Sequence, residues 1–243
     1  MTILAIDTST QWCSVALVQS KGVSADGREA PFSLVRHENL GPESSQYALD
    51  WVEALLDEAK LSFRDLDAIA VGIGPGAFTG IRIGVGIGQG MALGGDLPCL
   101  PIVCLDAIAL EGIRSLQIPS GAHLLVATDA RMSEVYWANY VVAENALPIR
   151  LGDIYLSAPK EIDMPSNNFY LLGSAVMAYP EDMSQLIDAA QAVDGQVVPH
   201  AISIADLGFE ALQKGLQVSA MDLQPIYIRD KVAQTIAERN QNS

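Results

Sequence analysis

The stretch that decides the fold is Gly74-Pro75-Gly76-Ala77-Phe78-Thr79-Gly80-Ile81-Arg82-Ile83-Gly84, and its glycine spacing continues through Gly86, Gly88 and Gly90. It follows an apolar run, residues 68–73, whose β-branched content is typical of a buried strand. Gly-Pro-Gly favours a tight turn, because glycine tolerates positive φ and proline fixes its own φ. We expect a helix to follow, from Thr79 as a candidate N-cap to Leu93.

The predicted helix carries two rows of glycine at i, i+4 spacing. One row is Gly80, Gly84 and Gly88, and the other is Gly86, Gly90 and Gly94. Each interior glycine costs roughly 1 kcal/mol of helix propensity relative to alanine, so six would melt an isolated helix. Close packing against a neighbouring element offsets this cost, as in helix interfaces built on small residues. The neighbour is either another part of the chain or a partner protein, and the sequence leaves both open.

Composition indicates an acidic globular protein. The 243 residues allow one large or two medium domains, and half are apolar, which is ample for a core. There are 14 Lys and Arg against 29 Asp and Glu, which gives a net charge of −15. Nucleic acids are bound through Lys and Arg that neutralise phosphates, so this balance opposes direct RNA binding. If the protein works on RNA, we expect another molecule to hold the RNA.

The cysteines and the N-terminal sequence favour a soluble, cytoplasmic protein. Cys13, Cys99 and Cys104 form no paired framework, and two lie in apolar runs, so we expect buried, reduced thiols. The N-terminus lacks the basic segment of a signal peptide. No uncharged run reaches the roughly 18 residues of a membrane helix, so we expect no membrane association.

Hydrophobic periodicity predicts the order β-β-β-α-β-α in the first half of the chain. The predicted elements there are strands 3–7, 13–18 and 32–37, helix 43–59, strand 68–73, helix 79–93, strand 97–103 and helix 106–116. The second half offers a weaker version of this pattern. Its predicted elements are strands 124–128, 134–142 and 168–172, helices 183–190 and 202–214, and a last ordered segment, 223–232.

This order predicts an α/β fold of two related subdomains with mixed sheets flanked by helices. We place the first subdomain at residues 1–105 and the second at 106–222. Residues 223–243 form a C-terminal segment whose packing the pattern does not define, and it ends in a polar tail that we expect to fray. A ligand would normally bind in the cleft between the two subdomains.

Polar residues after the first predicted strand form one candidate site. Asp7, Thr8 and Ser9 offer a carboxylate and two hydroxyls where nucleotide phosphates or Mg²⁺ can bind. The alternative is an Asx or Ser/Thr turn that closes a hairpin. We favour the turn, because a phosphate-binding loop usually has glycine at the position of Thr8.

The start of the glycine-rich helix is a second candidate. Gly74, Gly76 and Thr79 are possible contacts for an anion, through backbone N–H groups that have no partner within the helix. The stretch is not a Walker loop, because no Gly-Lys-Ser/Thr follows. It is not a dinucleotide-binding fingerprint either, because its later glycines lie inside the helix.

The second half repeats the combination of strand, Asp and turn. Asp129 begins that turn, and Arg131 is a candidate to pair with Glu134 or with a carboxylate of a partner, although a structural turn is favoured again. Catalytic equipment is otherwise thin, since the sequence has no serine nucleophile elbow. The three histidines are scattered without ligands at metal-binding spacing: His37, His123 and His200.

Four motifs together resemble the bacterial TsaB (YeaZ) family. They are Ile-Leu-Ala-Ile-Asp-Thr-Ser (3–9), the glycine motif (74–84), Asp-Ala-Arg-Met-Ser-Glu-Val-Tyr (129–136) and Ile-Tyr-Ile-Arg-Asp-Lys-Val-Ala (226–233). The motifs span nearly the whole chain, and the glycine motif is highly specific. The resemblance implies the actin/Hsp70-like (ASKHA) fold. It also implies a non-catalytic partner of TsaD in making N6-threonylcarbamoyladenosine at position 37 of tRNA, together with the ATPase TsaE.

Two departures from related patterns bear on catalysis. TsaD-like proteins carry a metal-binding His-x-x-x-His, and its two positions fall on Leu105 and Ala109 here. The resemblance therefore implies no cofactor for this chain, with ATP and a metal held by the partner subunits. Ser133 stands where the Asp-Ala-Arg motif commonly has glycine, which makes the geometry of that turn less certain. We further expect a homodimer when the chain is alone, and contact with tRNA only through the complex.

We expect helices 43–59 and 79–93 to lie side by side and to present a joint face to TsaD. Glycine rows allow close approach, and aromatic residues are common interface anchors. The expected contact residues are Tyr47, Trp51, Leu55, Gly80, Ile83, Gly84, Ile87, Gly88 and Met91. The competing hypothesis is a free-standing enzyme of the same fold, either a small-molecule kinase or a peptidase. A kinase of this fold needs phosphate-loop glycines near the N-terminus, and Thr8 speaks against it.

Overall fold

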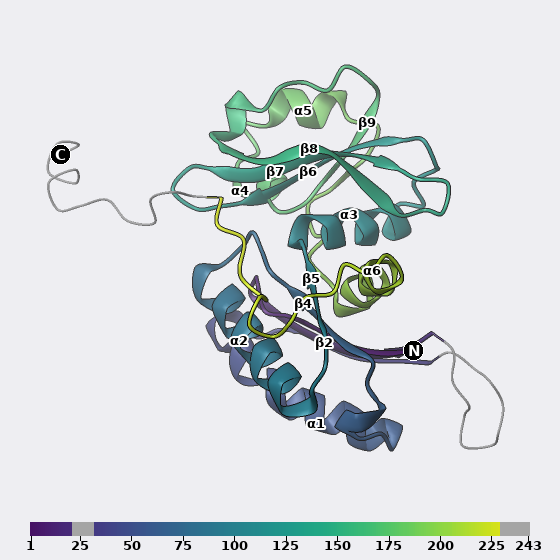
Figure 1. Ribbon diagram of the computed structural model, residues 1–243. Coiled ribbons are helices and arrows are strands. Elements are labelled where there is room, and N and C mark those ends of the chain that lie inside the picture. The colour runs from purple at the N-terminus through teal and green to yellow at the C-terminus, as the bar shows by residue number, and fades with distance from the viewer. Residues whose placement is uncertain (21–31, 229–243) are drawn as a thin grey trace, which may run out of the picture.

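The chain folds into two lobes, each built on one five-stranded sheet, with helices on the outer faces and between the sheets (Figure 1). The computed structural model describes residues 1–20 and 32–228. None of the helices in these two ranges has the length and hydropathy required to span a membrane. The three cysteines are free and buried, as expected.

The first sheet has the order β3-β2-β1-β4-β5. Its strands are β1 (Thr2–Asp7), β2 (Trp12–Gln19), β3 (Phe32–Asn39), β4 (Ala68–Gly72) and β5 (Cys99–Ile102). The strands β1 to β3 pair antiparallel, and β4 and β5 continue parallel to β1. All six residues of β1 are buried, because this central strand is covered on both faces. The five strands predicted here are confirmed within a few residues at their ends.

Two helices cover the outer face of this sheet, α1 (Ala48–Ala59) and α2 (Phe78–Gly95), and they share one hydrophobic core with it. The predicted helix 43–59 is split, because residues Gly41–Gln46 form a separate 3-10 helix, η1. A second 3-10 helix, η2 (Phe63–Asp65), follows α1. The prediction of Thr79 as an N-cap is wrong. The N-cap is Ala77, whose N–H donates to the carbonyl of Ser9 at 2.7 Å.

The second sheet repeats the first. Its strands are β6 (His123–Asp129), β7 (Val135–Val142), β8 (Pro148–Ser157), β9 (Phe169–Leu172) and β10 (Val193–Asp194). The order β10-β9-β6-β7-β8 again places an antiparallel meander beside a parallel pair. The short helices α4 (Ala175–Ala178) and α5 (Ser184–Ala189) pack on its outer face. Two related mixed sheets flanked by helices were predicted, and this arrangement confirms the actin/Hsp70-like fold.

The edge strand β8 was missed by the sequence analysis. Gly152 interrupts it with a φ of +85°, and the pairing with β7 shifts register between Trp137 and Asn139. Ile149 and Leu151 are 51% and 41% exposed, so apolar residues do not mark a buried face. The alternation that identifies a strand is therefore broken at Gly152, which leaves only short alternating runs on either side.

Two helices lie between the sheets, α3 (Cys104–Ser115) and α6 (Ala201–Gln213). The helix α3 shares a core with the second sheet, whereas α6 packs on the first. They are joined by an ion pair between Arg114 and Asp206 at 2.6 Å. The Ser203 hydroxyl also donates to Glu111 at 2.7 Å. A division into residues 1–105 and 106–222 is therefore wrong for α6, which returns to the first lobe.

The segment after α6 also belongs to the first lobe. Val218 pairs with Cys99, Leu223 lies in the core under α2, and the N–H of Ile226 donates to the carbonyl of Ile73 at 2.9 Å. The predicted ordered segment 223–232 is described as far as Ile228. Residues 229–243, with the rest of that prediction and the polar tail, lie outside the described residues.

Candidate functional site

The turn between β1 and β2 is closed by its own hydrogen bonds. Asp7 Oδ1 accepts from the backbone N–H of Ser9 at 3.1 Å and from its hydroxyl at 2.9 Å. The Cys104 thiol donates to Asp7 Oδ2 at 3.3 Å. Burial raises the pKa of Asp7 above its ordinary value, although the hydrogen bonds from Ser9 and Cys104 act to lower it. This is the Asx-type turn that the sequence analysis favoured over a phosphate site.

Helix α2 lies directly on this turn. The Thr8 hydroxyl donates to the carbonyl of Gly80 at 2.8 Å. A Cβ placed on Gly80 would collide with the carbonyl oxygen of Thr8. The three residues Asp7, Thr8 and Ser9 are each only 1% exposed. The chain's own helix therefore covers the turn, and the three side chains do not face solvent.

The prediction that an anion binds at the β1–β2 turn and at the start of α2 needs correction. Gly74 is buried, and its N–H donates to Cys104 Sγ at 3.1 Å. Gly76 lies against the turn, because a Cβ on it would be 2.5 Å from the carbonyl oxygen of Ser9. Six residues were predicted as anion contacts. Of these, Thr79 is exposed and Gly76 is half-buried. Asp7, Thr8, Ser9 and Gly74 have partners inside the chain and do not face solvent.

The turn between β6 and β7 is likewise structural. Asp129 Oδ1 accepts from the N–H of Arg131 and from the Tyr179 hydroxyl, both at 2.8 Å. The Arg131 guanidinium pairs with Asp129 Oδ2 at 3.0 Å, and Glu134 closes the turn through its backbone N–H, which donates to the carbonyl of Arg131. Ser133 has a φ of +57°, which explains why glycine suits this position.

The two positions that correspond to metal-binding histidines are filled by core residues. Leu105 and Ala109 are fully buried in α3, in the core that this helix forms with the second sheet. Within residues 1–20 and 32–228, no group of three or more His, Cys, Asp or Glu is arranged to hold a metal ion. These two apolar side chains offer no ligand atoms to a metal.

The structure decides which glycine row of α2 faces outward. A Cβ on Gly84 would lie 2.6 Å from the Thr8 hydroxyl, and one on Gly88 would lie 2.5 Å from Val71. In contrast, a Cβ on Gly86, Gly90 or Gly94 would meet nothing within 4 Å. The sequence left open which row faces a partner, although Gly80, Gly84 and Gly88 were among the expected contacts. These three glycines face the chain's own first lobe, and the other row faces outward.

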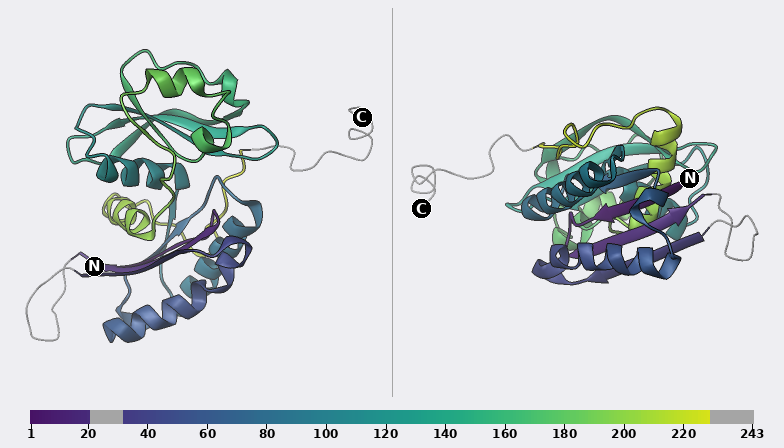
Figure 2. Two further views of the ribbon diagram at one scale, coloured as in Figure 1. Left: turned by 180° about the vertical axis from the view of Figure 1, so that it is seen from behind. Right: turned by 60° about the horizontal axis from the view of Figure 1, so that its bottom comes forward.

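The other predicted contact residues divide between core and surface. Leu55 is fully buried within the first lobe, so its predicted place at an interface is wrong. Met91 is 9% exposed and lines a groove beside α1, so its predicted contact with a partner stays a prediction. Ile83 and Ile87 are half-buried on α2. The helices α1 and α2 do cover the same face of the first sheet, as Figures 1 and 2 show.

The aromatic anchors lie on the far flank of α1. Tyr47 is 39% exposed, and its ring centroid is 6.3 Å from that of Trp51. Helical spacing aligns these two residues with Glu58, which pairs with Arg36 of β3 at 2.6 Å. Tyr47 and Trp51 therefore border the edge strand β3, on the flank of α1 that faces away from α2.

Comparisons with known proteins agree over most of the chain. A family model described as TsaD, tRNA N6-adenosine threonylcarbamoyltransferase, matches residues 38–236. The chain is 34% identical over 240 residues to the Escherichia coli K12 protein named "tRNA threonylcarbamoyladenosine biosynthesis protein TsaB", with 96% of each chain covered. A Haemophilus influenzae protein of the same name is 30% identical over 244 residues, covering 96% of this chain and 95% of its own. The chain belongs to the TsaB (YeaZ) family.

A solved structure supports the same assignment for this TsaB-family chain. The structure titled "YeaZ from Pseudomonas aeruginosa" superposes with a TM-score of 0.81 at 34% identity. The alignment covers 93% of this chain and 99% of the Pseudomonas chain. The resemblance inferred from the four motifs is therefore confirmed.

Sequence analysis missed two side-chain clusters of this TsaB-family chain. The Arg82 guanidinium lies 3.4 Å from the ring centroid of Phe78 and donates through Nε to the Tyr227 hydroxyl at 3.0 Å. The His37 ring stacks on Trp12 at 4.5 Å and lies 4.3 Å from the His200 ring. Each cluster gains one distant member, Tyr227 or His200, because the chain returns to the first lobe after β10. Phe78 and Arg82 lie four residues apart on α2, so their i, i+4 spacing is the one local sequence signal.

The histidine pair predicts acid sensitivity. Burial, assisted by the nearby His200, lowers the pKa of His37 from 6.5 to about 4. Between these two pH values the unfolded chain binds more protons than the folded one, so stability is complete above about pH 6.5 and falls as pH drops toward 4. His37→Phe keeps the stacking and removes the charge. Because the pair is partly exposed, we expect the free energy of unfolding of the wild type to fall by only about 1 kcal/mol over this pH range, or about 3 °C in Tm. The variant should not show this loss.

Thermal unfolding of both proteins from about pH 7.5 to 4.5 provides the measurement. Groups far from this pair titrate equally in the two proteins, so the difference between their Tm curves isolates His37 together with its effect on the neighbouring His200. Parallel curves would contradict the assignment of this acid sensitivity to the histidine pair.

Proposed function

We propose that this chain is a non-catalytic subunit that docks a TsaD-type transferase in making N6-threonylcarbamoyladenosine at position 37 of tRNA. The relatives from Escherichia coli and Haemophilus influenzae are named for threonylcarbamoyladenosine biosynthesis, and they align with 96% of this chain. In this proposal, the outer face of the first lobe, formed by α1 and α2, is the docking surface. The transferase carries out the catalytic reaction.

The observation that carries the proposal is the closed turn between β1 and β2. A kinase of this fold needs phosphate-loop glycines at this place, whereas Thr8 stands there in this chain and its hydroxyl donates to the carbonyl of Gly80 of α2. Core residues at Leu105 and Ala109 support the same conclusion, because a metal centre cannot be built on them. The free-standing kinase or peptidase is therefore the weaker alternative.

The proposal also assigns the remaining components. ATP and a metal belong to the partner subunits, TsaE joins the complex as its ATPase, and the complex works in the cytoplasm. When the transferase is absent, the chain pairs with a second copy of itself. Because this chain has a net charge of −15, basic surfaces of its partner bind the tRNA, and the chain itself does not.

Binding by the isolated chain tests this assignment. We expect it to bind tRNA no more tightly than about 10⁻⁴ M at physiological salt, the weak end of non-specific affinity. We also expect no stoichiometric iron or zinc after purification without chelators or a histidine tag. Fluorescence titration with labelled tRNA and elemental analysis provide the two measurements. Micromolar tRNA binding, or one tightly held metal per chain, would contradict the proposal.

A further inference from the structure

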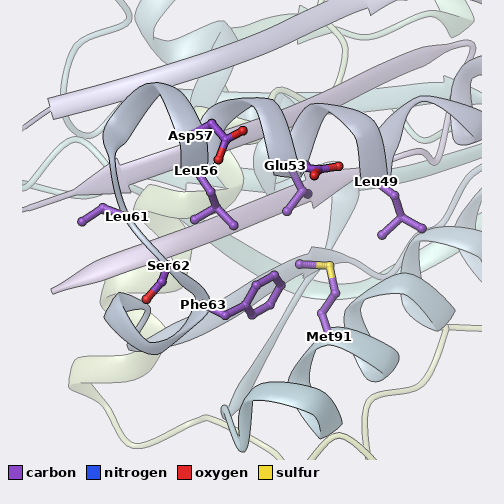
Figure 3. A pocket seen from close by; sticks show the side chains of 9 residues that line it. Leu49, Glu53, Leu56, Asp57, Leu61, Ser62, Phe63 and Met91 are labelled. Carbon is purple, nitrogen blue, oxygen red and sulfur yellow. The ribbon is translucent and has the colours of Figure 1, made fainter.

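A groove opens between α1 and the second half of α2. It measures about 440 Å³, and Figure 3 shows its lining from both helices and from the turn after α1. The floor and walls are mainly apolar. We call this the acidic groove, and its residues are Leu49, Val52, Glu53, Leu56, Asp57, Leu61, Ser62, Phe63 and Met91.

The charged residues that line the groove are all negative. Its two charged lining residues are Glu53 and Asp57, which follow each other at i, i+4 along α1. The helix α1 carries two further acids and no Lys or Arg, and α2 has Arg82 as its single charged residue. Lys60 lies just beyond the end of α1 and does not line the groove.

We propose that the acidic groove takes an apolar side chain from a partner element that carries Lys or Arg beside it. This inference rests on the proposed function and adds the chemistry of the partner. An apolar pocket of this size has room for a large side chain and its immediate neighbours, and a buried apolar side chain is a typical interface anchor. The carboxylates of Glu53 and Asp57 at its rim then favour cationic neighbours for that anchor.

The same charges disfavour a second copy of this chain in the groove. A two-fold interface places the same surface patch of both subunits against itself. Pairing through this face would bring the acids of one α1 close to those of the other, and like charges at an interface oppose association. The groove thereby selects a basic partner over self-association.

The preference for a basic partner predicts that the complex with the transferase and the homodimer respond to salt in opposite ways. Screening weakens attraction between unlike charges and also weakens repulsion between like charges, with a Debye length of about 10 Å at 0.1 M. Raising NaCl from about 50 to 500 mM should therefore weaken the complex with the transferase about tenfold. The homodimer should become tighter over the same range.

The test compares three proteins by titration and by analytical ultracentrifugation, with the TsaD-type transferase of the same organism as the probe. They are the wild type, the groove variant Glu53→Lys/Asp57→Lys, and the control variant Asp182→Lys/Asp188→Lys. The control makes the same charge change at exposed positions of the second lobe. At low salt we expect the groove variant to bind the transferase at least tenfold more weakly, and the control to stay within about twofold of the wild type.

The outcomes separate this inference from the proposed function. If the wild type forms no complex with the transferase, the proposed function fails, and this inference fails with it. If the wild type forms a complex that neither salt nor the groove variant affects, this inference alone fails. A homodimer that weakens with added salt would also overturn it.

Discussion

Gly80→Ala should destabilise the protein, whereas Gly86→Ala on the same helix should stabilise it. The added methyl group at Gly80 would collide with the carbonyl oxygen of Thr8, so α2 would have to move away from the β1–β2 turn. We expect a loss of about 2 kcal/mol, or about 6 °C in Tm. At Gly86 the methyl group meets nothing within 4 Å. The gain in helix propensity there is up to about 1 kcal/mol.

Thermal and urea unfolding of the two variants provide the measurement. Each serves as the control of the other, because residue type, substitution and helix are the same. Gly90→Ala repeats the outward test, since its Cβ also meets open space. Destabilisation of similar size at Gly80 and Gly86 would contradict the inward and outward assignment of the two rows.

The second large effect concerns binding. We expect Gly86→Leu to keep the fold and to weaken association with the transferase about 100-fold. In the isolated chain the leucine side chain points away from the first lobe, and its helix propensity is close to that of alanine, so we expect the variant to be at least as stable as the wild type. In the complex it would hold apart two helix surfaces that glycine allows to approach closely. A 100-fold loss corresponds to about 2.7 kcal/mol.

Calorimetric titration of the transferase and thermal unfolding of the variant measure the two effects separately. Ala189→Leu, on the exposed end of α5 in the second lobe, controls for the addition of a surface leucine. If the folded Gly86→Leu variant binds like the wild type, the outward glycine row does not form the docking surface.

Much of the fold follows from local patterns. The β1 sequence is apolar on both faces, and the helices flanking the first sheet show regular periodicity, so their positions were predictable. The edge strand β8 was not, because Gly152 and a register shift remove its alternation. The return of α6 to the first lobe was also missed, since periodicity describes an element and not the sheet on which it packs.

The sequence predicts which residues of α2 are involved in close packing, but not which side of the helix faces inward. The spacing of glycines identified α2 as a helix that needs a close neighbour, but spacing alone treats both rows as equivalent. The rows are distinguished by tertiary contacts, since Gly80 and Gly84 lie against Thr8 and Gly88 lies against Val71. The meeting of His37 with His200 depends on tertiary structure in the same way, because α6 brings the second ring to the first lobe.

The rate of tRNA modification as a function of subunit concentration tests the central claim most directly. A reconstituted reaction with the transferase, TsaE, ATP and the threonylcarbamoyl donor is titrated with the wild type or with Gly86→Leu, and threonylcarbamoyladenosine in tRNA is quantified. If the chain acts by docking alone, both proteins reach the same maximal rate, and the variant requires about 100-fold more protein. A lower maximal rate at full occupancy of the complex, or full activity without a complex, would contradict this account.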